Sequence, residues 1–269
     1  MAEPLIAGTE SKNLGELGFS DEKGGAHASR TIMLNELQIL FSAVRDTRAC
    51  KNDFRSAIVD ENVLGKRSEK TRVLTFRHLV DLYGLDPKLP VFRGLRFFWE
   101  RDEGGEALSA FLCAFSRDSL LRSSFQLVLS APYGSVVSRE LMEGQIEAKY
   151  PGRFSTATLK SSAQNINSSW TKAGHLSGRV RKIRTPAEPT LGSAAYAVFL
   201  GYLNGIRGSS LFESEYAKIL DCSADRVLEL VQQAALKGWM TVNRIGDVVE
   251  VAFPNIITLA EKGILREQS

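Results

Sequence analysis

Residues 154–186 read FSTATLKSSAQNINSSWTKAGHLSGRVRKIRTP, and the first half of this stretch predicts one amphipathic helix. Ser155 is a suitable N-cap residue, and Phe154 and Leu159 have the spacing of a hydrophobic staple. Gly174 is a suitable C-cap glycine. Between these limits apolar residues recur at steps of four and three, which predicts a single buried stripe. The stripe consists of Leu159, Ala163, Ile166, Trp170 and Ala173.

The second half of the stretch predicts a short basic ribbon of two strands. From His175 to Arg184 the chain alternates, with Val180 and Ile183 placed between basic residues. Another helix, over about residues 138–149, precedes the stretch, and Pro151-Gly152 supplies a turn between the two helices. Two helices joined by a tight turn and followed by a basic ribbon are typical of a winged helix-turn-helix.

Positive charge is concentrated in the same part of the chain. Residues 148–187 contain no Asp or Glu, but they contain eight basic residues: Lys149, Arg153, Lys160, Lys172, Arg179, Arg181, Lys182 and Arg184. The net charge of all 269 residues is only +3, which leaves −5 for the rest of the chain. One basic region on an otherwise mildly acidic protein is the pattern expected of a polyanion-binding site.

The whole chain predicts a mainly α fold in four parts. Residues 1–29 lack a sustained hydrophobic period and predict a flexible N-terminal arm. Residues 30–131 hold several helical stretches dense in Leu and Phe, which predict a helical bundle, and Ser68 is a suitable N-cap for one of these helices. Residues 132–190 form the basic winged-helix-like module, and residues 191–269 predict a C-terminal winged-helix module. The two winged helix-turn-helix-like modules are expected to carry short β-hairpin wings.

The C-terminal module has the better-formed pattern but the weaker charge. Three helices are predicted within residues 193–237, followed by a hairpin around Gly246-Asp247 and a last helix from Asn255 to Leu265. Yet residues 191–269 contain seven basic against nine acidic side chains. Charge, more than the quality of the pattern, therefore selects the middle module as the DNA-binding part.

We expect DNA contacts from the polar face of the helix and from the basic ribbon. Basic residues neutralise phosphates, and amide side chains can read adenine edges. The residues expected to bind DNA are Lys160, Gln164, Asn167, Lys172, His175, Arg179, Arg181, Lys182, Arg184 and, from an earlier basic cluster, Arg67.

Each of these features also has a structural interpretation. The ribbon could be a solvated charged strand, and the amides could be an ordinary polar helix face. Trp170 lies on the apolar stripe, which favours core packing over base stacking. Arg67 and its basic neighbours could instead pair with Glu61 and Glu69, while Asp118 could cap its helix.

The sequence contains no motif for catalysis, metal binding or cofactor binding that we could identify. Gly65-Lys66-Arg67-Ser68 lacks the upstream glycine of a phosphate-binding loop, and no zinc-protease or hydrolase motif occurs. Cys50, Cys113 and Cys222 are far apart, which argues for reduced thiols and a cytoplasmic location. The apolar segment 191–206 is shorter than a membrane span and predicts a buried helix, so no membrane partner is expected.

Three short runs resemble the BrxA family of BREX phage-defence systems. They are NVLGKRSEKTR at residues 62–72, AFSRDSLLR at residues 114–122 and SSWTKAGHL at residues 168–176. The resemblance covers roughly residues 33–251. It implies a small, largely helical, non-enzymatic protein with helix-turn-helix-like parts. Such a protein would bind double-stranded DNA beside a methyltransferase and other BREX components.

Taken together, the sequence predicts a non-enzymatic accessory protein that binds double-stranded DNA mainly through its phosphates. Expected partners are DNA and other defence-system proteins, an oligomer is possible, and no cofactor is expected. Two alternatives stay open. The winged helices could serve as docking surfaces of a protein-interaction scaffold, as the acidic balance of the last module suggests, or the protein could be an RNA-binding regulator.

Overall fold

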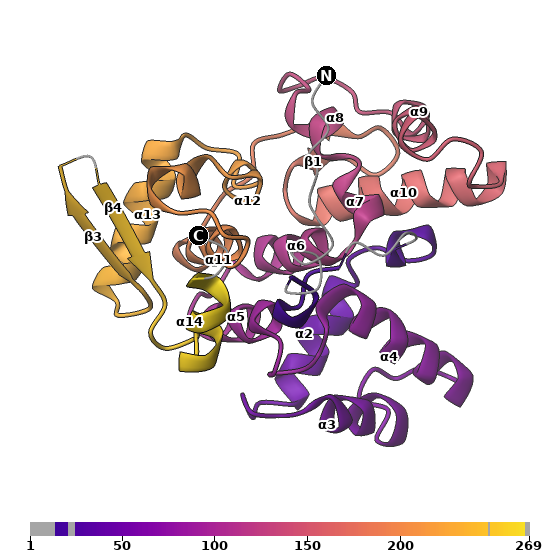
Figure 1. Ribbon diagram of the computed structural model, residues 1–269. Coiled ribbons are helices and arrows are strands. Elements are labelled where there is room, and N and C mark those ends of the chain that lie inside the picture. Colours follow the sequence, from indigo (N-terminus) through magenta and orange to yellow (C-terminus); the bar gives the residue numbers. More distant parts are fainter. Residues whose placement is uncertain (1–13, 21–24, 247, 267–269) are drawn as a thin grey trace.

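The structure is a computed structural model that describes residues 14–20, 25–246 and 248–266. It is mainly helical, with two small antiparallel sheets of two strands each, as the sequence predicts (Figure 1). Within the described residues, none of the helices has the length and apolar character needed to cross a membrane.

The N-terminal half is built from short helices. Ser68 caps the longest of them as predicted, because its hydroxyl oxygen accepts a hydrogen bond from the Thr71 amide at 3.2 Å. The elements are η1 (Ala26–Ala28), α2 (Leu34–Ala43), α3 (Lys51–Arg55), the π-helical turn η2 (Ser56–Asp60), α4 (Glu69–Tyr83), α5 (Pro90–Trp99), α6 (Glu106–Arg117), α7 (Ser119–Arg122) and α8 (Phe125–Leu129).

The middle part contains the predicted helix pair and ribbon. These are α9 (Arg139–Lys149), α10 (Thr156–Lys172), β1 (Leu176–Ser177) and β2 (Ile183–Arg184). The predicted N-cap is confirmed, because the Ser155 hydroxyl accepts a hydrogen bond from the Thr158 amide at 3.2 Å. Four residues of the predicted stripe are buried: Ala163, Ile166, Trp170 and Ala173. The Trp170 indole donates to the Ser124 hydroxyl, so this tryptophan is part of the core.

The C-terminal part repeats the same order of elements. It contains α11 (Leu191–Leu203), η3 (Gly208–Glu213), α12 (Glu215–Lys218), α13 (Ala224–Leu236), β3 (Thr241–Ile245), β4 (Val248–Ala252) and α14 (Leu259–Arg266). The expected inward alternation along the second strand is confirmed, since Val249, Val251 and Phe253 are all buried. The last helix begins four residues later than predicted, at Leu259.

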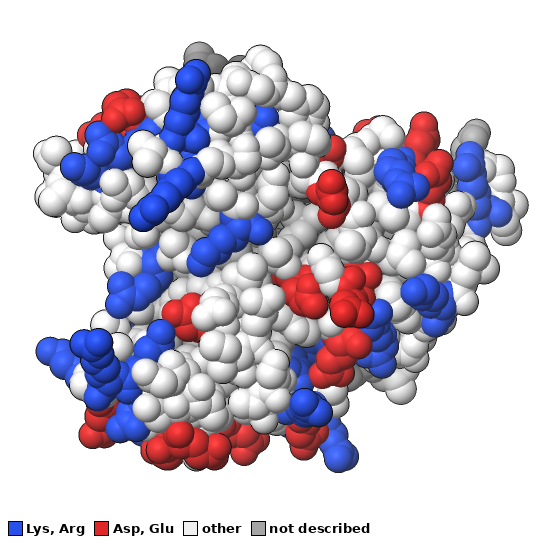
Figure 2. Space-filling model, turned by 180° about the vertical axis from the view of Figure 1, so that it is seen from behind, with Lys and Arg blue, Asp and Glu red and all other residues white. Residues whose placement is uncertain are grey.

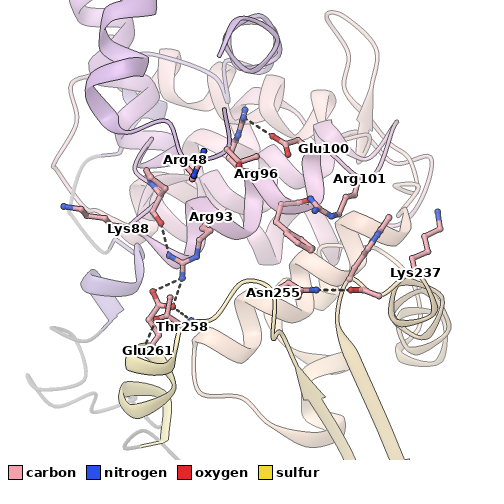
Figure 3. Close-up of a pocket in the computed structure, with 15 residues that line it drawn as sticks. Arg48, Lys88, Arg93, Arg96, Glu100, Arg101, Lys237, Asn255, Thr258 and Glu261 are labelled. Atoms are coloured by element: carbon pink, nitrogen blue, oxygen red, sulfur yellow. Dashed lines mark hydrogen bonds and ion pairs between the residues drawn. The ribbon is translucent and has the colours of Figure 1, made fainter. Parts of the chain in front are cut away.

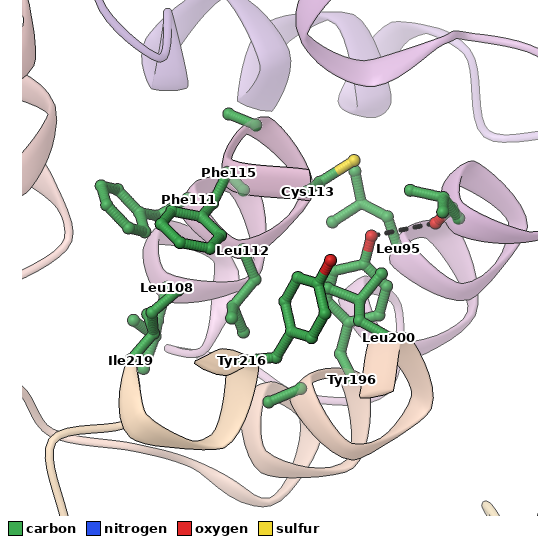
Figure 4. Close-up of a cluster of buried hydrophobic side chains, with 14 of the residues drawn as sticks. Leu95, Leu108, Phe111, Leu112, Cys113, Phe115, Tyr196, Leu200, Tyr216 and Ile219 are labelled. Carbon is green, nitrogen blue, oxygen red and sulfur yellow. Dashed lines mark hydrogen bonds between the residues drawn. The ribbon is translucent and has the colours of Figure 1, made fainter. Parts of the chain in front are cut away.

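Helices α6 and α11 lie at the centre of the molecule. The apolar segment predicted to be a buried helix is α11, and it packs against α5, α6, α12 and α13. Gly94 lets α5 approach it closely, because a Cβ there would lie 2.4 Å from the Phe199 ring. Figure 4 shows Tyr196 among the side chains packed between the helices, with its hydroxyl donating to the Val91 carbonyl at 2.9 Å.

One connected hydrophobic core joins all the predicted parts, from Leu17 to Leu265. The predicted flexible arm needs a correction where it is described. Leu17 is 1% exposed and His27 is 0% exposed, so residues 14–20 and 25–29 dock onto the core. Residues 1–13 and 21–24 of the predicted arm lie outside the described part. The predicted boundaries between the other parts stay predictions.

Candidate nucleic-acid interface

The middle module has the strand pairing of a winged helix. Strands β1 and β2 form an antiparallel hairpin, and Val136, which precedes α9, forms a bridge to Ile183 on the other side of β2. The Val137 amide donates to the Lys182 carbonyl at 3.0 Å, and the Arg184 amide donates to the Ser135 carbonyl at 2.9 Å. This pairing holds the start of α9 beside the basic ribbon.

The loop of the hairpin, residues 178–182, is the wing. Gly178 has a φ of +91°, and a Cβ there would lie 2.2 Å from the Arg181 carbonyl oxygen, so the tight turn requires glycine. The Lys182 ammonium donates to the Gly178 carbonyl at 2.7 Å and closes the loop. Val180 at the tip is 94% exposed, which leaves it and its basic neighbours outside the core.

A groove of about 800 Å³ lies between α10, the start of α9 and the wing. Five of the residues predicted to bind DNA line it together: Gln164, Asn167, Arg179, Arg181 and Lys182. The structure therefore brings the polar face of α10 and the basic ribbon into one concave surface. The other lining residues include Ser138, Arg139, Glu140, Asn165 and Ser168.

The groove carries an excess of positive charge. Its one carboxylate among the described lining residues, Glu140, is already paired with Arg139 at 2.7 Å. No described carboxylate lies within 4.0 Å of Arg179, Arg181 or Lys182. Figure 2 shows lysine and arginine side chains over the lobe that contains α9 and α10, at the upper left, while most visible acidic side chains lie elsewhere on that face. A phosphate group would find uncompensated cations here.

Arg184 is a correction to the predicted interface. It is 2% exposed, and its guanidinium holds the Asp221 carboxylate in a bidentate pair, with N–O distances of 2.8 and 2.6 Å. Burial raises the pKa of Asp221, but the hydrogen bond and charge of Arg184 outweigh burial and hold that pKa below its ordinary value. Arg184 therefore joins the middle module to the C-terminal one and is not available to DNA.

His175 is a second correction. Its ring is fully buried against Trp170 and Phe111, and Nε2 donates to the Ile219 carbonyl at 2.7 Å. Burial lowers the pKa of His175 to about 4, so the ring is neutral at pH 7. A neutral ring that is closed off from solvent cannot bind a phosphate.

Asn167 is corrected in part. It lines the groove but is only 3% exposed, which places it on the floor. Its Oδ1 atom has no hydrogen-bond partner among the described residues. The side chain does not reach out to a base edge.

The remaining predicted residues lie outside the groove. Lys160 is exposed one helical turn before Gln164 on the same face of α10. Lys172 is exposed, but its ammonium donates to the Thr31 hydroxyl at 2.9 Å. Arg67 is exposed on the loop before α4, while its neighbour Lys66 pairs with Glu36 rather than with the predicted acids. The groove and Lys160 therefore define the candidate interface.

Another side of α10 is covered by the N-terminal segment. His27 Nδ1 donates to the Asp118 carboxylate at 2.8 Å, and Nε2 lies 2.9 Å from the Ser169 hydroxyl. Asp118 also caps α7, a role that the sequence left open, by accepting from the Leu120 amide. Burial raises the pKa of Asp118, but the neighbouring His27 and the backbone donors outweigh burial and lower it. We call His27, Asp118 and Ser169 the latch.

The latch has the residue types of a hydrolase triad but not its accessibility. Its three residues are at most 1% exposed. The Ser169 hydroxyl is also 3.0 Å from the Ile32 amide, which donates to it, and 2.9 Å from the Asn165 carbonyl. No substrate can reach this serine, so the arrangement fixes the N-terminal segment to α10.

Arg139 lines the groove although no sequence pattern predicted it. Arg139 is the first residue of α9 and pairs with Glu140 and Glu143. The winged-helix topology could have predicted it. In that topology a short strand before the first helix of the pair bonds to the ribbon, which brings the start of the helix to the groove. The sequence offers only Val136 and Val137 as that strand.

Comparison with known proteins does not extend this description. No protein-family model matches the chain, and no curated protein matches it at a significant level.

Proposed function

We propose that this protein is a non-enzymatic double-stranded DNA-binding protein that contacts mainly backbone phosphates. The observation that carries the proposal is the groove in which Arg179, Arg181 and Lys182 lie beside the polar face of α10 without a carboxylate partner. In a winged helix the second helix of the pair enters the major groove and the wing lies along the backbone. Cations on the wing neutralise phosphates there.

The groove supports backbone binding more strongly than base reading. Gln164 is the exposed amide on α10, because Asn167 is on the floor and the Asn165 amide donates to the His27 carbonyl at 3.1 Å. One exposed amide offers little sequence discrimination, whereas three wing cations offer strong, salt-dependent attachment. We therefore expect similar affinity for duplexes of different sequence.

The test replaces Arg179 and Arg181 with Ala and measures duplex binding by fluorescence anisotropy over a salt series. Each lost phosphate contact lowers the slope of log affinity against log salt by about 0.9, so the double variant should lose about two units. The loss should be the same for unrelated duplex sequences. An unchanged slope would overturn the assignment of the groove.

The matched control is the R226A/R244A variant in the C-terminal module. Arg226 and Arg244 occupy α13 and β3, the counterparts of α10 and the wing, and both are exposed. The control removes the same charge, from one helix residue and one hairpin residue of the C-terminal module. It should leave the slope unchanged, which separates a local site from a general effect of net charge.

We further propose a role beside other proteins of a BREX-like phage-defence system in the cytoplasm, with oligomer formation possible. This step rests on the resemblance of three short sequence runs to the BrxA family. Deleting the gene from a host that carries such a system, and then measuring phage plating, tests it. Full resistance without the protein would count against a defence role.

An observation in the C-terminal module favours protein docking as a second function. Two apolar side chains that pair across the end of its hairpin are largely exposed, Ile245 at 83% and Val248 at 71%. Exposed apolar groups near one another suit a protein partner rather than DNA. RNA binding is tested in the same anisotropy assay, where a structured RNA competing better than duplex DNA would replace our proposal.

A further inference from the structure

A second basic surface lies on the other side of the molecule, in a cleft of about 1100 Å³. One wall is α5 and the loops before and after it, and the other is the end of α13 with residues 255–261 (Figure 3). Figure 1 places these elements to the left of α6, whereas α9 and α10 lie at the upper right. The cleft is therefore separate from the α10 groove.

The cleft contains six cations and two carboxylates. The cations are Arg48, Lys88, Arg93, Arg96, Arg101 and Lys237, and the carboxylates are Glu100 and Glu261. Both carboxylates are already paired, since Arg93 holds Glu261 at 2.6 Å and Arg96 holds Glu100 at 2.9 Å. The charge that remains is carried by four exposed side chains.

Two of these exposed cations are held in place by aromatic rings. The Arg101 guanidinium lies 3.8 Å from the centre of the Phe97 ring, and the Lys237 ammonium lies 5.0 Å from the Trp239 ring. No described carboxylate lies within 4.0 Å of Lys88, Arg101 or Lys237. Cation–π contacts reduce the freedom that these side chains would lose on binding an anion.

The arrangement suits an extended polyanion better than a small ligand. The Arg93 guanidinium uses four of its five N–H groups on the Ile256 and Pro87 carbonyls and on Glu261, so most of its donors are committed within the protein. The uncommitted cations are on the exposed walls, where they can follow a backbone but cannot enclose a small molecule. Small-ligand sites instead bury most of the ligand and use inward polar groups.

We propose that this cleft binds the phosphodiester backbone of a nucleic acid, independently of the α10 groove. A single chain would then hold two nucleic-acid segments on opposite sides. The cations that carry the site are Lys88, Arg101 and Lys237, with Arg48 at the edge, where Asp46 lies 3.8 Å away.

The experiment measures anisotropy of labelled duplex and single-stranded DNA with the full chain. The variants are wild type, R101A/K237A, R179A/R181A, the combination of all four changes, and the R226A/R244A control. R101A/K237A should reduce the salt slope by about two, so that raising salt from about 50 to 200 mM costs about tenfold less affinity than in wild type. The combined variant should lose more slope than either double variant.

The outcomes separate this inference from the proposed function. A smaller salt slope in R101A/K237A, together with a wild-type slope in R179A/R181A, supports DNA binding by the cleft. The same result overturns DNA binding by the groove. If the salt slope of R101A/K237A equals that of the R226A/R244A control, the proposal that the cleft binds nucleic acid is wrong. If R101A/K237A loses affinity for only one of the two DNA forms, duplex or single-stranded, that form is the ligand of the cleft.

A competition experiment tests the size of the ligand. Inorganic pyrophosphate and ATP should displace the labelled DNA only as much as a simple salt of equal ionic strength does. The part of DNA binding that R101A/K237A loses is the part assigned to the cleft. If either compound abolished this part at a lower ionic strength than the simple salt, a small phosphate ligand would fill the cleft, and the proposal of a polymeric ligand would be wrong.

Discussion

The two winged helices of this chain have the same order of elements but different surfaces. In the first, the wing presents Arg179 and Arg181 beside an apolar tip, with no described carboxylate close to them. In the second, the hairpin is longer and better paired, over residues 241–252, yet it exposes Ile245 and Val248 together with Glu250 and one cation, Arg244. A winged-helix backbone therefore does not by itself indicate which module contacts DNA.

The two modules also differ in what their buried charges do. Arg184, which looks like one more DNA-binding cation, joins the first module to Asp221 of the second. Asp221 has a φ of +59°, so the loop that presents it is in the left-handed region. The basic ribbon therefore combines exposed cations, which we propose contact DNA, with one buried cation that joins the two modules.

The largest effect is expected from breaking this shared contact with Asp221→Asn. Asn tolerates a positive φ, but it leaves the Arg184 guanidinium buried without a negative charge. The loss of a partner from a buried pair should lower the free energy of unfolding by about 3 to 5 kcal/mol in urea titrations.

Asp46→Asn is the matched control, because the Arg48 and Asp46 side chains are 92% and 65% exposed. It should not change stability measurably. If Asp221→Asn behaved like the control, the two modules would not depend on this pair for cohesion.

The next effect concerns His175, which bonds the first module to the Ile219 carbonyl of the second. Below its ordinary pKa of 6.5 the unfolded chain takes up a proton on this ring, but the folded chain does not do so until about pH 4. Stability should therefore be complete above about pH 6.5 and fall by about 3 kcal/mol as pH drops to about 4.

His175→Gln keeps a side-chain N–H donor but cannot be protonated in this range. Unfolding free energies measured from pH 7 to pH 4 should fall less steeply in this variant than in wild type. Carboxylates with lowered pKa values, such as Asp118, cause both proteins to lose stability at the acidic end of this range. Parallel curves for the two proteins would show that His175 does not set the slope.

The smallest effect is a gain of DNA binding by the second wing. Ile245→Arg combined with Val248→Lys places two cations on an exposed hairpin that now lacks them. If charge decides between the modules, the salt slope for duplex binding should steepen by up to about two units.

The control for this gain is Ile245→Ser combined with Val248→Ser, which removes the same apolar surface without adding charge. It should bind duplex DNA as wild type does. Equal slopes for the two variants would indicate that the orientation of the second wing, rather than its charge, keeps it away from DNA.

Local patterns predicted much of the fold. The N-caps at Ser68 and Ser155, the apolar stripe of α10 and the burial of α11 follow from neighbouring residues in the sequence, and the structure confirms them. These features depend on interactions within one helical turn or on one periodic face. The sequence therefore contains the information in a form that can be read directly.

Long-range partners could not be predicted in the same way. Arg184 and Asp221 are 37 residues apart, and His175 and Ile219 are 44 apart. A basic residue in a basic ribbon looks exposed until the fold brings a carboxylate to it. For the same reason the N-terminal segment looks unstructured by composition, although Leu17 and His27 are buried in places that distant elements provide.

The latch has a consequence for the order of events during synthesis. His27 leaves the ribosome early, but the Ser169 hydroxyl that it contacts follows 142 residues later. At about 5 to 20 residues per second, this interval lasts roughly 7 to 30 s. Throughout that time the latch lacks its serine, so a chaperone or protease that acts on the nascent chain meets the N-terminal segment before the latch is complete.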